Sequence, residues 1–321
     1  MAFVIQTRAA DRSGFPMQLS WITAALLAVP LHSAISAEKG GPAGFPNIIF
    51  AKTPERELRV DVFTPEGVKH PPLIVYIHGG GWKTGDRKSL FAKSLTADGF
   101  AVASIDYRFA REAKFPAQIF DCKGAIRWLR ANADRFGYDS KRIAVMGESA
   151  GGQLAVLLGT SGGVKELEGD VGGNAEQSSK VQAVVDYFGA TDFALRSRTQ
   201  PAMTEVPGSV AYEYLGGAVA EKPDLARLAS GAEFVSKDDP PLLAIHGDAD
   251  KQVLIDQSER IVDAYRNKGL EAELMVVPGG VHAGEGYHQG DIRETVVGFL
   301  SKRLGVKRKP VAETQRTFLA N

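Results

Sequence analysis

The strongest constraint on this chain is a serine set among glycines, where one apolar run ends and another begins. The stretch Gly147-Glu148-Ser149-Ala150-Gly151 follows residues 142–146, which predict a short buried strand, and precedes residues 153–158, which predict a buried helix. A tight turn between a strand and a helix crowds its own backbone, which favours glycine there. Such a turn exposes the serine Oγ at the helix N-terminus, where negative charge is stabilised. The pattern predicts a nucleophile at Ser149, although glycine-flanked serines also occur in ordinary turns.

Short apolar segments alternate with longer, helix-like ones along the rest of the chain. This alternation predicts a mostly parallel sheet covered by helices on both faces, in a single α/β domain over residues 45–306. Two stretches interrupt it, 161–180 and 191–236, and we expect each to form a rim or lid beside Ser149, with a surface loop of no functional role as the alternative. Strands are predicted over 57–63, 73–77, 101–105, 142–146, 181–188, 242–245 and 271–277, and helices over 89–97, 116–129, 153–158, 253–267 and 292–304.

The composition argues against several classes of function. Lys+Arg and Asp+Glu are equal at 38 each, so no net charge draws the chain to nucleic acid or to an anionic membrane surface. The single cysteine, Cys122, cannot form an internal disulfide, and its place in a predicted helix indicates a core thiol. No Cys/His cluster has the spacing of a zinc site, so we expect neither a metal nor an organic cofactor.

The two ends of the chain differ from the predicted domain. Arg8 and Arg12 precede an apolar run, 21–31, that is too short to span a bilayer, and small residues follow it. Residues 1–37 therefore predict a signal peptide, with a disordered leader as the alternative, and hence a periplasmic or secreted protein, otherwise a cytoplasmic one. Residues 307–321 predict a flexible, polar C-terminal tail.

A second glycine-rich motif, His78-Gly79-Gly80-Gly81-Trp82, comes directly after the apolar run 73–77. Acyl transfer requires N–H donors for the oxyanion that forms at the carbonyl, and glycines let backbone N–H groups point into a cleft. We expect Gly79 and Gly80 to supply two donors and Ala150 a third. A flexible loop is the alternative, and the apolar strand before the motif argues against it.

An acid and a base follow the serine in the chain order that this chemistry uses on a parallel sheet. Two carboxylates, Asp248 and Asp250, come just after the predicted strand 242–245, and position alone leaves both open as the acid. His282 lies on a glycine-rich loop after the last predicted strand, which favours it as the base over His288, six residues further on. His78 and His246 lie at strand ends, where structural roles are usual.

The motifs HGGGW, GESAGG, HGDADKQV and PGGVH together resemble the hormone-sensitive-lipase-like esterases of the α/β-hydrolase superfamily. The segments ASIDYR, FPAQIFDCKGAIRWLRANADRFGYD, LLGTSGGVKELEG and VVDYFGATDF further resemble the bacterial bifunctional feruloyl and acetylxylan esterase group, and the likeness covers residues 47–304. The resemblance implies an α/β-hydrolase fold with a small lid or rim insertion. One departure is Ala283-Gly284-Glu285 after His282, where Gly-Phe is commoner. The implied roles are nucleophile for Ser149, acid for Asp250, base for His282 and oxyanion donors for Gly79, Gly80 and Ala150.

We therefore expect a serine carboxylesterase, with a serine peptidase of the same fold or a catalytically silent binding protein as alternatives. Prolines and glycines interrupt 191–236, which argues against a long apolar lid helix and favours soluble short-chain, acetyl or hydroxycinnamoyl esters, including those of plant cell-wall polysaccharides, over triglycerides. We expect Trp82, Glu148 and Tyr187 to bind substrate. The expected partner is a small-molecule or oligosaccharide ester, with no nucleic acid and no stable membrane association after leader cleavage, and the oligomeric state stays open.

Overall fold

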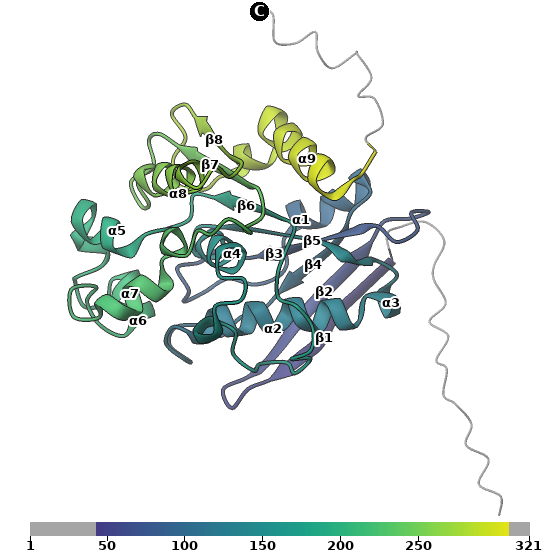
Figure 1. Cartoon of the computed structure of the whole chain (residues 1–321), viewed down its shortest axis with the longest axis horizontal. Coiled ribbons are helices and arrows are strands. Elements are labelled where there is room, and N and C mark those ends of the chain that lie inside the picture. Colours follow the sequence, from purple (N-terminus) through teal and green to yellow (C-terminus); the bar gives the residue numbers. More distant parts are fainter. Residues whose placement is uncertain (1–42, 308–321) are drawn as a thin grey trace, which may run out of the picture. The chain divides into compact units, whose positions relative to one another are not determined.

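The computed structural model describes residues 43–307, and its strands form one eight-stranded sheet in the order β1-β2-β4-β3-β5-β6-β7-β8 (Figure 1). From β4 to β8 neighbouring strands are parallel, whereas β1 and β2 are antiparallel to their neighbours. This is the mostly parallel sheet that the alternating segments predict. The strands are β1 (Ala43–Lys52), β2 (Glu57–Thr64), β3 (Pro72–Ile77), β4 (Ala101–Ile105), β5 (Asp139–Glu148), β6 (Ala183–Tyr187), β7 (Leu242–Gly247) and β8 (Ala272–Val277).

Helices cover both faces of the sheet, and the side chains of β3 show how. Val75 and Ile77 point into a core formed with α2, α3, α4 and α8, whereas Ile74 and Tyr76 point into a second core formed with α1 and α9. Because successive side chains of a strand point to opposite faces, a strand buried on both sides reads as a continuous apolar run. The covering helices are α1 (Leu90–Ser94), α2 (Ala117–Ala131), α3 (Ala133–Phe136), α4 (Ala150–Thr160), α8 (Asp256–Asn267) and α9 (Gly290–Leu304).

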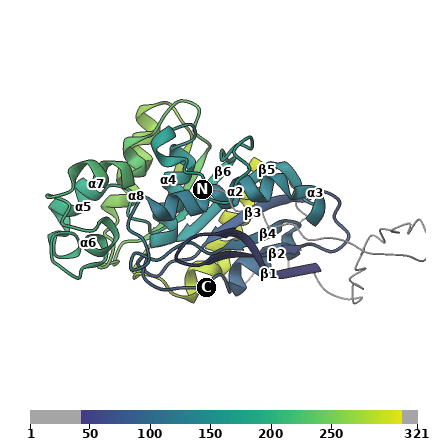
Figure 2. The same cartoon turned by 90° about the horizontal axis from the view of Figure 1, so that it is seen from below.

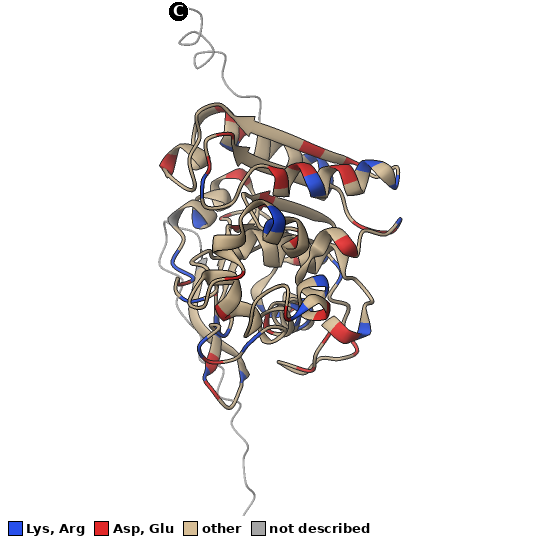
Figure 3. Cartoon of the chain, turned by 90° about the vertical axis from the view of Figure 1, so that its left-hand side faces the viewer, with Lys and Arg blue, Asp and Glu red and all other residues tan. Residues whose placement is uncertain are grey.

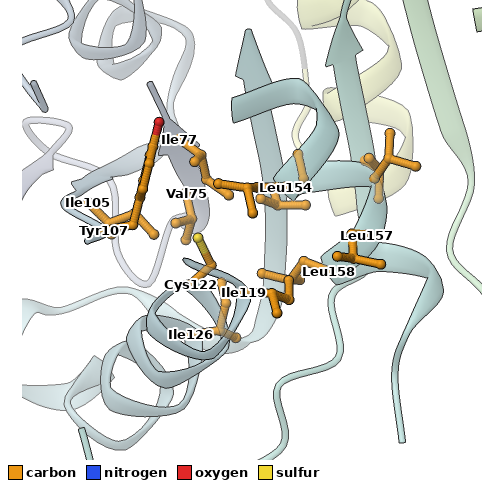
Figure 4. Packing of buried hydrophobic residues seen from close by; sticks show 14 of the residues in the cluster. Val75, Ile77, Ile105, Tyr107, Ile119, Cys122, Ile126, Leu154, Leu157 and Leu158 are labelled. Atoms are coloured by element: carbon orange, nitrogen blue, oxygen red, sulfur yellow. The ribbon is translucent and has the colours of Figure 1, made fainter. Parts of the chain in front are cut away.

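The core beneath the serine motif is apolar and closely packed (Figure 4). Ile119 and Ile126 of α2 pack together with Leu154 of α4 and Val75 of β3, and each side chain is fully buried. Burial of such a side chain stabilises the fold by roughly 1.5–3 kcal/mol. Cys122 is fully buried in this core, which confirms the predicted core thiol, and burial raises the pKa of the thiol well above its ordinary value.

The first strand, β1, is absent from the sequence predictions. Its pairing with β2 carries register shifts between Phe45 and Ile48 and again between Ile49 and Ala51. Asn47 between them has a φ of 63°, in the left-handed region. Each irregularity breaks the two-residue alternation by which a half-exposed strand is recognised, so this strand leaves only a weak pattern in the sequence.

The stretch 191–236, expected to form a rim or lid, folds into short helical segments. Its α-helices lie together on one side of the described domain, at the left in Figures 1 and 2. None of its α-helices exceeds 7 residues. Pro201, Gly216 and Gly231 lie within two residues of the last residues of α5, α6 and α7, which limits the length of these helices. The segments are α5 (Phe193–Thr199), η3 (Pro201–Met203), α6 (Val210–Leu215), α7 (Pro223–Ala229) and η4 (Gly231–Glu233).

The expectation that 161–180 forms a rim beside Ser149 is wrong. The segment begins where α4 ends, at the opposite end of that helix from Ser149, and it contains only the short η2 (Lys165–Leu167). Its Glu168 is bound by Lys123 and Arg127, both from α2. The segment therefore lies against α2, because the length of α4 carries the chain away from Ser149.

The expected leader, 1–37, and nearly all of the expected tail, 307–321, lie outside the described residues. Within 43–307, no helix combines the length and the apolar character that a bilayer crossing requires. Acidic and basic residues are intermingled over the described elements (Figure 3). The remaining short helical turns are η1 (Leu95–Asp98) and η5 (Glu285–His288).

Candidate active site

The predicted nucleophile, Ser149, lies between β5 and α4 in a strained conformation, with φ 52° and ψ −115°. Its backbone N–H donates to the carbonyl of Tyr187, at 2.8 Å, which ties the turn to the neighbouring strand β6. A Cβ at Gly151 would collide with the carbonyl oxygen of Ile77, so the first turn of α4 can approach β3 only with glycine there. The packing thus holds a backbone conformation that a residue other than glycine rarely adopts.

Three side chains from separate loops form a continuous hydrogen-bonded chain. Ser149 Oγ lies 2.9 Å from Nε2 of His282, and Nδ1 of the same imidazole lies 2.6 Å from Oδ2 of Asp250. With its proton on Nδ1, His282 donates to Asp250 and accepts from the serine hydroxyl. This is the geometry in which an imidazole can remove the serine proton while a carboxylate stabilises the resulting charge.

Asp250 is fixed as an ionised carboxylate. Its Oδ1 accepts the N–H groups of Gln252 and Val253, at 2.8 and 3.0 Å, and Oδ2 also lies 3.3 Å from Nε2 of His246. Burial alone would raise its pKa, but the hydrogen bonds from His246 and His282 outweigh burial and hold the pKa of Asp250 well below its ordinary value. The carboxylate therefore stays charged and oriented toward His282.

The second candidate acid, Asp248, has a different partner. Its Oδ1 accepts the N–H of Gly279 at 2.7 Å, at the start of the loop that carries His282. Its side chain is exposed and forms no contact with an imidazole among the described residues. Asp250 is thus the carboxylate that contacts His282, whereas Asp248 stabilises the loop that carries His282 by accepting a backbone N–H.

The loop after β3 lies directly against the serine turn. A Cβ at Gly79 would lie 2.9 Å from the carbonyl oxygen of Glu148 and 3.5 Å from Cβ of Ser149. Gly80 has a φ of 108°, a conformation that side chains rarely permit. Within residues 43–307, neither Gly79 nor Gly80 donates its N–H to a protein acceptor. Ala150 is the first residue of α4, and all three predicted oxyanion donors line the same cleft as Ser149.

These elements surround a cleft of about 550 Å³. Trp82 and Glu148, two of the expected substrate-binding residues, line it. The Trp82 ring is nevertheless buried, stacks on Tyr214 with centroids 4.2 Å apart and donates Nε1–H to Gln153. The full lining is His78, Gly79, Gly80, Gly81, Trp82, Gly85, Asp86, Glu148, Ser149, Ala150, Phe188, Ala190, Arg196, Met203, Val210, Gln252, Val253, His282 and Ala283.

The third expected substrate-binding residue, Tyr187, is placed elsewhere. Its side chain is fully buried in the core between the sheet, α1 and α9, where it contacts the ring of Phe91 edge-on, and it does not line the cleft. Strand alternation places Tyr187 on the same face of the sheet as Ala183 and Val185. The next residue, Phe188, lies beyond the end of β6 with a φ of 45°, and its ring packs against the His282 ring with centroids 4.8 Å apart. Phe188 could have been found from its position at the end of the predicted strand.

Two further residues at the site were missed from sequence. His288 stacks on Phe91 and lies 3.2 Å from Oε1 of Glu148, which also accepts the hydroxyl of Tyr76. Arg196 reaches the cleft from α5, and no local motif marks it. Within the described residues, no group of three or more His, Cys, Asp or Glu side chains is arranged to hold a metal ion.

Known proteins match both the sequence and the fold. The BD-FAE family model matches residues 60–265. Esterase LipC of Mycobacterium tuberculosis is 31% identical over 218 residues, which are 67% of this chain and 53% of the relative, so the chain spans about half the length of that relative. A truncated carbohydrate esterase from gut microbiota superposes with a TM-score of 0.75 at 32% identity, over 84% of this chain and 99% of that chain. The bifunctional GH43-CE of Bacteroides eggerthii superposes with a TM-score of 0.74 at 34% identity, over 81% of this chain and 38% of that chain. The family match confirms the resemblance seen in the motifs: the chain belongs to the BD-FAE family and has the α/β-hydrolase fold.

Proposed function

We propose that this protein is a serine carboxylesterase that acts through an acyl-enzyme on Ser149. The observation that carries the proposal is the hydrogen-bonded chain from Ser149 Oγ to His282 Nε2 and from His282 Nδ1 to Asp250 Oδ2, at 2.9 and 2.6 Å. Free serine is a weak nucleophile, and an adjacent base whose own orientation is fixed activates it. The naming of the matched relative LipC as an esterase supports the same reaction.

The proposed reaction has two halves. In the first, Ser149 Oγ attacks the ester carbonyl carbon while its proton passes to His282 Nε2, and the carbonyl electron pair moves onto the oxygen facing Gly79, Gly80 and Ala150. Collapse of this oxyanion breaks the bond to the alkoxy oxygen, which takes the proton from His282 and leaves as an alcohol. In the second half, water gives a proton to His282 as its oxygen attacks the acyl carbon, and collapse of the second oxyanion breaks the bond to Ser149 Oγ, which takes that proton from His282 as the carboxylic acid leaves. Asp250 stays ionised and stabilises the imidazolium in both halves.

The proposed substrates are soluble short-chain, acetyl or hydroxycinnamoyl esters, including those carried by plant cell-wall polysaccharides. Two observations support this class. Two structures matched at more than 30% identity are a carbohydrate esterase and a bifunctional GH43-CE. The cleft of about 550 Å³ lies beside α5 and α6, which are 7 and 6 residues long and too short to form an extended apolar cover of the kind a lipid-binding surface needs.

A panel of 4-nitrophenyl esters with acyl groups from acetyl to palmitoyl, together with methyl ferulate and acetylated xylan, tests this proposal. We expect kcat/KM to fall as the acyl chain grows beyond about eight carbons, because a small pocket gains little from each added methylene and then excludes it. A matched amide should react far more slowly than its ester.

Each alternative gives a different result on this panel once an emulsified long-chain triglyceride is added to it. Equal rates on that triglyceride and on short esters would indicate a lipase. Amide cleavage as fast as ester cleavage would indicate a peptidase. A folded protein that turns over no ester would indicate a binding protein.

A further inference from the structure

The cleft contains one lysine or arginine side chain among its lining residues, Arg196 of α5. Arg196 is only 3% exposed, so most of its guanidinium is removed from solvent. The other ionisable groups along the same lining are Asp86, Glu148 and the two histidines, His78 and His282. Among the residues that the structure describes, Arg196 is therefore the one permanently cationic group at the cleft wall.

The guanidinium has donors without acceptors. Its Nη2–H donates to the carbonyl of Gln252 at 2.8 Å, its Nε–H is buried without a partner, and Nη1 has no partner within residues 43–307. Among the described residues it forms no ion pair, and Asp250 and Asp256 act on it only through space. A guanidinium carries five N–H donors, so most of those of Arg196 have no acceptor among the described residues.

Two other buried arginines in the same protein show the ordinary arrangement. Arg108 donates to both carboxylate oxygens of Asp121, and Arg127 donates to Glu168 at 3.0 Å. Each is neutralised by a carboxylate from its own chain, as buried charges usually are. Arg196 departs from this arrangement, and it does so at the wall of the cleft that holds Ser149.

Burial without a partner is unfavourable for a cation. It lowers the pKa of Arg196 to about 10, although Asp250 and Asp256 act in the opposite direction, and the group still carries its charge at neutral pH. A bound carboxylate would supply the missing acceptors and the missing countercharge together, since guanidinium and carboxylate form paired hydrogen bonds.

We propose that Arg196 binds a carboxylate on the substrate, so that this cleft selects esters that carry a negatively charged group near the ester bond. The inference rests on the proposed esterase function and narrows its substrate class to acidic esters. Glu148 and Asp86 would repel an anion elsewhere in the cleft, and Glu148 is already engaged by Tyr76 and His288. The anion is thus directed to Arg196.

A purely structural role for Arg196 makes a different prediction. Its bond to the Gln252 carbonyl lies two residues from Asp250, so the side chain could serve only to hold the loop of the acid. In that case its removal would slow all esters by the same factor. The informative quantity is therefore the ratio of kcat/KM for an anionic ester to kcat/KM for its neutral counterpart.

Two matched pairs of esters measure this ratio at each end of the substrate. On the acyl side, 4-nitrophenyl hemisuccinate is compared with 4-nitrophenyl butyrate, and on the alcohol side an acetylated methyl glucuronide with the corresponding acetylated glucoside. The variants are Arg196→Met, Arg196→Lys and Arg196→Gln, with Arg198→Met as the control, since Arg198 is an exposed arginine of the same helix. We expect the anionic-to-neutral ratio to fall about 10- to 100-fold in Arg196→Met for at least one pair, and less in Arg196→Lys.

Other outcomes would overturn the inference. An unchanged ratio in Arg196→Met at both ends, with neutral esters still hydrolysed, would leave the esterase proposal standing and refute the role of Arg196. An equal fall in Arg198→Met would assign the effect to long-range charge. If Arg196→Met does not fold, Arg196→Gln supplies the same comparison.

Binding tests the inference without turnover. In the Ser149→Ala background, the Kd values for the hemisuccinate ester and for the acetylated glucuronide are measured by calorimetry, and at least one of them should rise at least about tenfold in Arg196→Met. Unchanged Kd values for both anionic esters would refute the inference, whether or not the wild-type protein hydrolyses esters.

Discussion

The two carboxylates that follow β7 have different hydrogen-bond partners. Asp250 accepts from His282 Nδ1, whereas Asp248 accepts from the backbone of Gly279. We predict that Asp250→Asn lowers kcat by about four orders of magnitude, because an amide stabilises the wrong imidazole tautomer and no longer stabilises the imidazolium. Asp248→Asn should cost less than about tenfold, since an amide oxygen can still accept the Gly279 N–H. Steady-state kinetics on one short ester measures both, and the reverse ranking would reassign the acid to Asp248.

His282 and Ser149 should act as one unit. We predict that His282→Ala lowers kcat about as much as Ser149→Ala, and that the double substitution is hardly worse than either single one, because each removes the same relay. His288→Ala is the matched control and should be mild, since His288 contacts Glu148 and Phe91 and not the serine. If the loss of kcat in the double substitution equalled the product of the losses in the two single ones, Ser149 and His282 would not share a mechanism.

At the scale of elements, β6 carries a buried acid behind the serine turn. Asp186 pairs with Gly147 in the sheet register and is fully buried, and its Oδ1 accepts the N–H of Gly189 while Oδ2 has no partner among the described residues. Burial raises its pKa from 3.8 to about 7, although nearby His246 acts in the opposite direction. Below about pH 7 the folded protein therefore favours the protonated form of this side chain.

This raised pKa makes stability depend on pH in a definite direction. In the folded state Asp186 keeps a proton that the unfolded chain releases above its ordinary pKa, so its stabilising contribution is complete below pH 3.8 and is lost as pH rises to about 7. Asp186→Asn does not titrate. We predict that the free energy of unfolding of wild type, relative to Asp186→Asn, falls between these pH values by at most about 4 kcal/mol. Urea unfolding at several pH values measures it, and a difference that is constant with pH would contradict the prediction.

The elements that the sequence predicts well are those with strong apolar patterns. The run 73–77 has the composition of a strand buried on both sides and forms β3, which packs into both cores. The predictions fail where a strand has an irregular pattern, or where the position of a loop depends on the length of the helix before it. Register shifts leave β1 without a clear alternating pattern. The 11 residues of α4 form about 16 Å of helix, so the segment 161–180 begins far from Ser149.

At the scale of the whole chain, the parallel sheet explains why the relay could be anticipated. Ser149, Asp250 and His282 each follow a strand of the same parallel set, and the carboxyl ends of parallel strands lie along one edge. Chain order and glycine-rich loops thus suffice to nominate Ser149 and His282 and to limit the acid to Asp248 or Asp250. The choice between Asp248 and Asp250 required the family resemblance, and only the hydrogen bonds show what each carboxylate holds.

Side chains that reach the cleft from the segment 191–236 could not be anticipated in this way. Arg196 belongs to a helix of 7 residues whose position depends on contacts with several loops, and nothing in its local sequence distinguishes it from the exposed Arg198. Tyr187 and Phe188 show the same limit at the end of β6, where the left-handed backbone of Phe188 accompanies the placing of its ring at the cleft while Tyr187 stays in the core.

Replacing Ser149 by alanine decides whether the serine turn is a catalytic centre. The measurement is kcat for a short soluble ester by wild type and by Ser149→Ala, after circular dichroism and thermal melting show that both proteins fold alike. We predict a loss of at least about three orders of magnitude, with the small residual rate coming from the oxyanion donors and substrate binding alone. A folded Ser149→Ala protein that keeps most of the wild-type activity would contradict the assignment of Ser149 as the nucleophile.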